Sequence, residues 1–243
     1  MEELDIKKLI CLLLAALMCG WAMADETVRI DHENMVLDGE WVDGEMRPNE
    51  YHYFPFTIAE TGKLTARVQT YYANAHFELL DADLIPWAGV YISGSQGAPD
   101  TEDMVYYLDP GEYYLRSDGD SSMRGDFRIK LMFDEYACDE TDANDDYHGA
   151  TALANGETMS GVLTERDEYD YYSFALESES QPYLTIHSES DGQQIAVIYD
   201  GDMVEIQTIY DLKTYAENLE LTAGTYYIAI SGAKGAYTLR CAY

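Results

Sequence analysis

The feature that most constrains this sequence is an internal repeat. Residues 50–56 read EYHYFPF, and residues 168–174 read EYDYYSF. Two further echoes follow in the same order: LDPGEYYL at 108–115 with LTAGTYYI at 221–228, and GDFRI at 125–129 with GAYTL at 235–239. Recurrence in one order indicates a tandem duplication. We therefore expect two domains, a divergent first repeat over residues 25–137 and a second repeat over residues 138–243.

Within each repeat the pattern is that of β-strands. From Met35 onward, short alternating runs are broken by Gly, Asp, Asn and Pro, and no long stretch has a helical period. Side chains two apart in a strand share a face, so we expect Phe54, Phe56 and Ile58 to point into one core. Seven or eight such strands per repeat predict an all-β fold of two tandem antiparallel β-sandwiches.

Two finer predictions concern the connections between strands. The last two strands of each repeat are separated by short polar segments, 117–124 and 231–234, so we expect each pair to be neighbours in one sheet. Asp200-Gly201 lies between two apolar runs and is typical of a tight hairpin turn.

The N-terminal segment has the pattern of a signal peptide. Two lysines at positions 7 and 8 precede an apolar run, 9–23, that is too short to cross a bilayer as a helix. The run ends in Ala22-Met23-Ala24, the small-x-small pattern of signal-peptidase cleavage. We expect residues 1–24 to be removed after Ala24, leaving a secreted protein without a membrane span. Acidic residues ahead of the lysines favour the alternative, an uncleaved anchor.

The charge of the chain limits its partners. Its 46 acidic and 14 basic residues give a net charge of −32. Binding to nucleic acid depends on basic side chains that neutralise phosphates, so we do not expect nucleic acid as a partner. Anionic membrane surfaces are disfavoured for the same reason. The negative electrostatic field of such a chain favours binding of divalent cations, or simply solubility outside the cell.

Two cysteines, Cys138 and Cys241, would remain after cleavage. They stand at the two ends of the second repeat, and in an oxidising compartment a disulfide could join its first and last strands. Closing a loop of about 100 residues is worth roughly 4 to 5 kcal/mol on the chain-entropy model. The alternative is that Cys241 is a small buried hydrophobic residue, because it is in phase with Tyr237 and Leu239. The sequence leaves both open.

Several motifs of the second repeat together resemble one family. They are ETDAND at 140–145, ATAL at 150–153, SGVL at 160–163, the tyrosine-rich strand at 167–174, AGTYY at 223–227 and GAYTL at 235–239. These motifs resemble the bacterial pre-peptidase C-terminal domain, which is appended to many secreted proteases and collagenases; the first repeat resembles it less closely. The resemblance implies a jelly-roll-like β-sandwich without catalysis of its own. In related proteins it aids secretion or targeting, or binds an extracellular polymer such as collagen or polysaccharide.

A calcium site is the sharpest chemical hypothesis. In an extended lead-in, alternate oxygen-bearing side chains project to one side, and calcium binds about six to eight oxygens. Similar domains in collagenases bind calcium at matching positions, so the predicted Ca²⁺ ligands are Glu140, Asp142, Asn144, Asp145, Asp167 and Asp170. The alternative is a solvated acidic linker. The first repeat has Asn49 and His52 in place of the last two, so we expect no site there.

Outward tyrosines are the second candidate. Tyr171 and Tyr227, with Tyr53 and Tyr114 in the first repeat, fall out of phase with the inward sets. An exposed row of tyrosines can stack on sugars or hold an extended chain. Tyrosine is also a good strand former that packs across neighbouring strands, which is the alternative for each of them.

Catalytic motifs are missing from the sequence. It has no Gly-x-Ser-x-Gly elbow, no His-Glu-x-x-His pair and no phosphate-binding glycine loop. We therefore expect a secreted, non-enzymatic module that binds an extracellular polysaccharide or protein, with the second repeat stabilised by calcium. The alternatives are a structural or assembly component of the cell envelope without a specific ligand, and a secreted hydrolase whose carboxylates the sequence does not single out.

Overall fold

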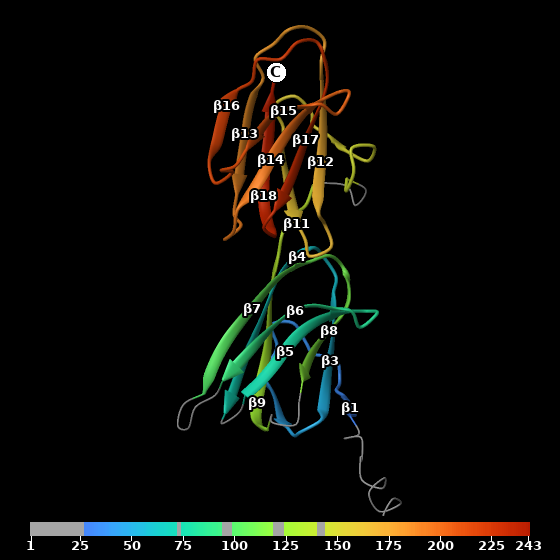
Figure 1. Ribbon diagram of the computed structural model, residues 1–243, viewed down its shortest axis with the longest axis vertical. Coiled ribbons are helices and arrows are strands. Elements are labelled where there is room, and N and C mark those ends of the chain that lie inside the picture. Colours follow the sequence, from blue (N-terminus) through green and yellow to red (C-terminus); the bar gives the residue numbers. More distant parts are fainter. Residues whose placement is uncertain (1–26, 72–73, 94–98, 119–123, 140–143) are drawn as a thin grey trace, which may run out of the picture.

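The computed structural model describes residues 27–71, 74–93, 99–118, 124–139 and 144–243. In these residues all regular structure is β, arranged as two bodies stacked end to end along the long axis of the molecule (Figure 1). The predicted all-β class with two tandem sandwiches is confirmed. No helix among the described residues is long and apolar enough to span a membrane.

The first body contains nine strands in two sheets. A five-stranded sheet has the order β1-β3-β8-β5-β6, and a four-stranded sheet has the order β2-β9-β4-β7. The strands are β1 (Val28–Asp31), β2 (Val42–Met46), β3 (Glu50–Ile58), β4 (Gly62–Tyr71), β5 (Asn74–Asp81), β6 (Pro86–Ser93), β7 (Asp100–Leu108), β8 (Gly111–Asp118) and β9 (Gly125–Glu135).

The second body repeats this plan. Its sheets have the orders β10-β12-β17-β14-β15 and β11-β18-β13-β16. The strands are β10 (Thr151–Ala152), β11 (Thr158–Leu163), β12 (Tyr169–Leu176), β13 (Tyr183–Ser188), β14 (Gln194–Asp200), β15 (Glu205–Ile209), β16 (Tyr215–Asn218), β17 (Gly224–Gly232) and β18 (Gly235–Ala242). Adding nine to each strand number of the first body gives the order of the second, which is the structural counterpart of the sequence repeat.

Both sandwiches depart from a purely antiparallel arrangement at their first strand. β1 pairs in parallel with β3, and β10 pairs in parallel with β12. All other strand pairs are antiparallel. The parallel pairing with β3 ends at Tyr53, two residues before Pro55, so Pro55 lies outside that ladder. A proline is tolerated there because that ladder needs no N–H donor at its position.

Each sandwich has its own core, built from the side chains that alternate inward. In the first body the predicted set Phe54, Phe56 and Ile58 is almost completely buried, together with inward residues of the facing sheet such as Leu64 and Ile129. The second core is formed in the same way from both of its sheets. Burying one such side chain stabilises the fold by roughly 1.5 to 3 kcal/mol, so each body has an independent source of stability.

The prediction that the last two strands of each repeat pair with each other is wrong. β8 lies between β3 and β5, whereas β9 lies between β2 and β4 in the other sheet. β17 and β18 are separated in the same way. Their inward residues enter one core from opposite sheets, as Leu115 and Phe127 do in the first body. The last two strands of each repeat therefore lie in different layers of the sandwich.

The hairpin at Asp200 is also longer than predicted. The Asp200 Oδ1 accepts hydrogen bonds from the backbone N–H groups of Asp202 (3.0 Å) and Val204 (2.9 Å), and Met203 has a φ of 60°. The left-handed residue is thus Met203 and not Gly201. In the first body Asp81 makes the same two bonds, to the N–H groups of Asp83 and Ile85, with a φ of 62° at Leu84. The aspartate closes the turn in both repeats.

Candidate functional site

The outer face of the second five-stranded sheet carries a group of tyrosines that we call the tyrosine face: Tyr147, Tyr169, Tyr171, Tyr199 and Tyr227. Tyr227 is the direct cross-strand partner of Tyr199. The Tyr169 and Tyr171 rings lie 6.0 Å apart, and the Tyr147 ring meets the Tyr227 ring edge-on at 5.9 Å. Two of the five rings, Tyr147 and Tyr169, are exposed, and the other three are half-buried.

The tyrosine face includes the two tyrosines predicted for this repeat, Tyr171 and Tyr227, and three that the sequence analysis missed. Tyr199 could have been found, because Ala196 and Ile198 point inward and Tyr199 is out of phase with them. Burial raises the pKa of Tyr171, and nearby Tyr199, Tyr169, Asp146 and Glu168 raise it further. The Tyr171 phenol therefore stays neutral at physiological pH and can donate a hydrogen bond.

The equivalent face of the first repeat is covered by its own side chains. The predicted Tyr53 and Tyr114 are half-buried and meet edge-on at 6.5 Å. The Arg29 guanidinium lies over the Tyr53 ring at 4.2 Å, held by a 2.8 Å bond to Asp31. Arg116 lies 5.4 Å from the centre of the Tyr51 ring. Both faces carry tyrosines, and on the face of the first repeat arginine side chains lie over the rings.

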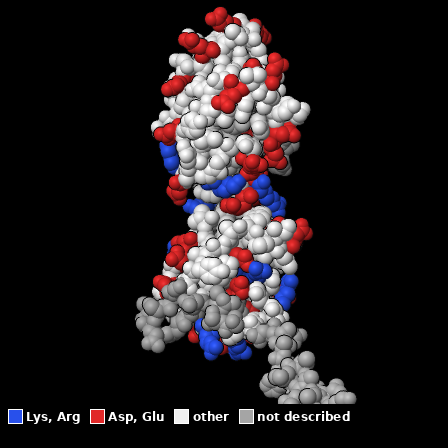
Figure 2. All heavy atoms as spheres, viewed as in Figure 1, with Lys and Arg blue, Asp and Glu red and all other residues white. Residues whose placement is uncertain are grey.

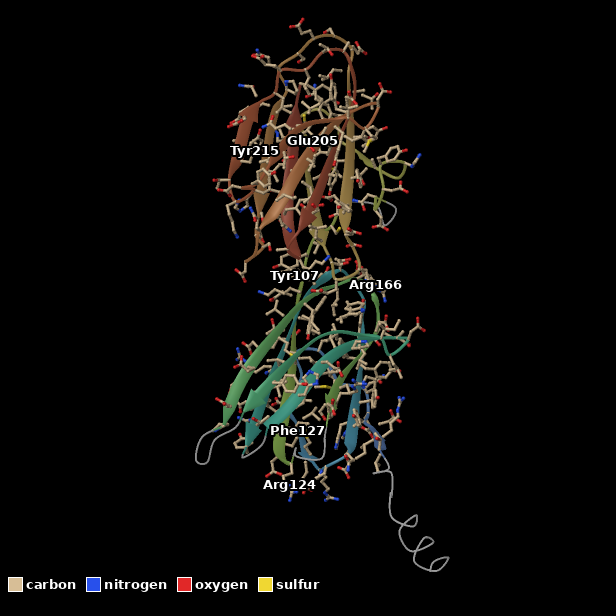
Figure 3. The ribbon with its side chains drawn as sticks, viewed as in Figure 1. Tyr107, Arg124, Phe127, Arg166, Glu205 and Tyr215 are labelled. Atoms are coloured by element: carbon tan, nitrogen blue, oxygen red, sulfur yellow. The ribbon has the colours of Figure 1, made fainter. Side chains whose placement is uncertain are left out.

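The two bodies contact each other at a narrow waist. Tyr107 at the end of β7 packs with Val162 and Ala236 of the second body, and Tyr136 lies against this cluster. The backbone N–H of Glu165 donates to the Tyr107 carbonyl at 2.8 Å. Figure 3 shows Tyr107 and Arg166 at this level, and Figure 2 shows basic side chains gathered around it.

The Arg166 side chain of the second body contacts two aromatic rings of the first. Its guanidinium lies 5.7 Å from the centres of both the Trp87 and the Tyr113 rings. A cation at this distance from an aromatic face is attracted to it. Next to it, burial raises the pKa of Glu165, although Lys234 acts in the opposite direction. The waist thus combines an apolar cluster, a backbone bond and a cation–π contact.

A cavity of about 580 Å³ opens at the waist and collects most of the predicted calcium ligands. Asn144, Asp145, Asp167 and Asp170 line it, whereas Glu140 and Asp142 lie outside the described residues. The first body contributes Asp109 and Glu60, which the sequence analysis did not foresee. Among the described residues, no three His, Cys, Asp or Glu side chains are close enough together to hold a metal ion.

Two predicted ligands, Asn144 and Asp170, are almost completely buried. The Tyr237 hydroxyl donates to the Asp170 Oδ2 at 2.5 Å, and the Tyr172 hydroxyl lies 2.8 Å from the Tyr237 hydroxyl. Buried polar groups need such partners, because an unbonded one costs several kcal/mol. A side chain at Gly161 would bring its Cβ within 2.5 Å of the Tyr237 ring, so the close approach of this tyrosine requires glycine there.

A second polar contact joins the two bodies beside the cavity. The Thr164 hydroxyl lies 2.6 Å from the Asp167 Oδ2 and 2.8 Å from the Asp109 Oδ2 of the first body. The Asp167 oxygen also accepts the Thr164 N–H at 2.9 Å. A hydroxyl has one hydrogen to donate, so the Thr164 hydroxyl can donate to only one of the two carboxylates at a time.

The two cysteines are not joined. Cys241 is fully buried in the second core, opposite Leu184 on the neighbouring strand, and burial raises the pKa of its thiol to about 11. Cys138 is exposed on the connection and lines the waist cavity. Of the two readings left open by the sequence, the disulfide is therefore not formed, because one side chain points into the sandwich and the other lies outside it. The alternative, Cys241 as a buried hydrophobic residue, is what the structure shows.

No family model and no curated protein matches the chain. Among solved structures, the pre-peptidase C-terminal domain of a Bacillus anthracis collagenase is similar at 16% identity over 44% of this chain and 94% of that domain, with a TM-score of 0.32. The exported protein XepA of PBSX is 10% identical over 86% and 88% of the two chains, with a TM-score of 0.33. Tandem CBM51 modules from a Streptococcus pneumoniae glycoside hydrolase are 7% identical over 82% of each chain, with a TM-score of 0.26.

Proposed function

We propose that this chain is an exported, non-catalytic binding protein whose second sandwich holds an extracellular polymer on its tyrosine face. The observation that carries the proposal is the grouping of five tyrosines on one outer sheet face instead of in the core. Aromatic rings with a polar tip suit surfaces that bind ligands, since one end is apolar and the other forms hydrogen bonds. Grouped exposed apolar surface is uncommon on proteins without such a role.

The arrangement of the rings also favours an extended polymer over a small molecule as the ligand. Tyr227 and Tyr199 stand side by side on adjacent strands, and Tyr171 lies diagonally from Tyr227 on β12. Because neighbouring strands are about 4.8 Å apart, the rings extend over three strands of an open sheet face. An extended chain lying on this face would contact several rings at once, which suits a polysaccharide or a polypeptide.

The test is retention of the protein on insoluble polymers, with collagen, cellulose and mucin as the panel. We expect Tyr171→Ala together with Tyr227→Ala to abolish retention on whichever polymer binds the parent protein. Tyr183→Ala is the matched control, because Tyr183 is 40% exposed on β13 of the other sheet. Equal loss with the control, or full retention with both face tyrosines removed, would refute the proposal.

We further propose that the waist cavity binds calcium when the lead-in residues complete it. Four of the six predicted ligands line one cavity with Asp109 and Glu60 from the first body, all of them oxygen donors of the kind that calcium prefers. Two of them, Asn144 and Asp170, are buried polar groups. Because the described residues alone do not bring three acidic ligands together, the proposal depends on Glu140 and Asp142.

Calcium that binds only the folded protein raises its stability by about 2.7 kcal/mol at a hundredfold excess over the dissociation constant. We therefore expect a higher melting temperature in calcium than in chelator, and no difference for Asp145→Ala or Asp170→Ala. Asp145 is the cleaner probe because its side chain is exposed. Glu157→Ala, an exposed acid away from the cavity, should keep the full response. Identical melts of the parent protein with and without chelator would exclude calcium here.

A further inference from the structure

The tyrosine face is surrounded by acids. Asp146 and Glu168 are close enough to Tyr171 to affect the pKa of its phenol, and Glu205 does the same at Tyr199. Asp146, Glu168 and Glu205 are all exposed. A ligand on this face therefore meets aromatic rings edged by negative charge, and a cation is the group best suited to both.

The second repeat has few cations of its own, and the structure places them elsewhere. Residues 138–243 contain 20 acidic and four basic residues. Arg166 lies over Trp87 and Tyr113 at the waist, Lys213 donates to the Ser190 carbonyl, Lys234 to the Asp167 carbonyl and Arg240 to the Gly156 carbonyl. Within the described residues, no cation–π contact involves a ring of the tyrosine face.

The first repeat shows what fills the equivalent position. There the Arg29 guanidinium lies 4.2 Å over the ring of Tyr53, the sequence counterpart of Tyr171. The same sheet face thus carries an internal arginine in the first copy, whereas in the described part of the second copy no Lys or Arg lies over its rings and only His148 lies against Tyr147, with ring centres 3.9 Å apart. Charge complementarity across an interface selects partners and speeds association, so the second face is suited to a cation that comes from another molecule.

Resting on the proposed binding function, we infer that the ligand of the tyrosine face is a cationic, extended polypeptide segment with arginine or lysine at alternate positions. Side chains two apart in an extended chain are about 6.6 Å apart, and the Tyr169 and Tyr171 rings are 6.0 Å apart. Successive basic side chains of one segment can therefore lie over successive rings. Asp146, Glu168 and Glu205, which form the acidic rim of the tyrosine face, then pair with the positive charges of these side chains.

The experiment measures binding of the full chain to a fluorescent peptide of alternating arginine and serine by anisotropy, at low and moderate salt. The key comparison peptide replaces arginine with citrulline, which has the same shape without the charge. We expect at least tenfold weaker binding of the citrulline peptide, and at least tenfold weaker binding of the arginine peptide to Tyr171→Ala with Tyr227→Ala. A chitosan oligosaccharide, a cationic sugar polymer, should bind more weakly than the arginine peptide.

Two triple variants separate the face from the overall charge of the protein. Asp146→Asn, Glu168→Gln and Glu205→Gln neutralise the rim, whereas Glu157→Gln, Glu179→Gln and Glu220→Gln remove three exposed acids elsewhere on the second repeat. We expect a loss of tenfold or more from the first set and less than twofold from the second. Equal losses from both sets, equal binding of the citrulline peptide, or tighter binding of chitosan would overturn the inference. Loss of polymer retention by the tyrosine variants would still support the proposed function in those cases.

Discussion

The buried tyrosine pair beneath the waist cavity allows a quantitative prediction. Tyr237→Phe removes a hydroxyl that donates to the Asp170 carboxylate at 2.5 Å and lies 2.8 Å from the Tyr172 hydroxyl. A hydrogen bond to a charged group contributes about 1.5 to 3 kcal/mol, and a neutral one about 0.5 to 1.5 kcal/mol. We expect Tyr237→Phe to lower the free energy of unfolding of the second sandwich by about 2 to 4 kcal/mol. That is a large part of the 5 to 15 kcal/mol that is typical of a domain.

The assay is urea denaturation followed by circular dichroism, with the transitions of the two sandwiches fitted separately. Tyr226→Phe is the matched control, because the Tyr226 hydroxyl donates to a neutral group, the Thr222 carbonyl, at 3.0 Å. We expect the control to lose about 1 kcal/mol. If Tyr237→Phe costs no more than the control, the Asp170 contact does not stabilise the fold and the reasoning is wrong.

Three further predictions concern packing, the waist and pH. Gly161→Ala would place a methyl group 2.5 Å from the Tyr237 ring, and overpacking of this kind costs about 1 to 3 kcal/mol, measurable as a lower urea midpoint of the second sandwich. Arg166→Gln removes the contacts with Trp87 and Tyr113, so we expect Trp87 fluorescence to change while the free energy of unfolding of the second sandwich stays within about 1 kcal/mol of the parent value. Burial lowers the pKa of His32 and of His52 below 6.5, and the two rings form a hydrogen bond with each other. The unfolded chain therefore binds more protons than the folded protein below this pH. We expect the first sandwich to lose stability as pH falls through about 6.5. His32→Phe, which keeps the stacking on Phe54, should flatten this pH dependence, and an unchanged slope would contradict the assignment.

Alternation in the sequence was sufficient to predict the class of fold and the inward side chains, because strand periodicity depends only on neighbouring residues. It was insufficient for strand order. The segments 117–124 and 231–234 are short enough for a hairpin, yet they connect strands of different sheets. The choice between pairing in one layer and crossing to the other is made by tertiary packing of residues such as Leu115 and Phe127 across the core. That contact leaves no local signal.

The candidate site was only partly predictable for a similar reason. Tyr171 and Tyr227 could be identified from their phase, and Asn144, Asp145, Asp167 and Asp170 do line one cavity. Asp109 and Arg166 were missed because their roles depend on the contact between the two sandwiches, which a repeat seen as two separate units does not reveal. The sequence could not decide between a disulfide and a buried Cys241, because proximity of chain ends in a sandwich says nothing about the side to which each thiol points.

The connection between the sandwiches is anchored at both of its ends. The Tyr136 N–H donates to the Thr61 carbonyl on one side, and the Asp139 N–H donates to the Ser160 carbonyl on the other. The three residue steps between these two hydrogen bonds span at most about 10 Å. The two sandwiches are therefore not joined by a long flexible linker. A long ligand that touches both copies would therefore meet its second contact at a high effective concentration, and only when its own spacing matches that of the protein.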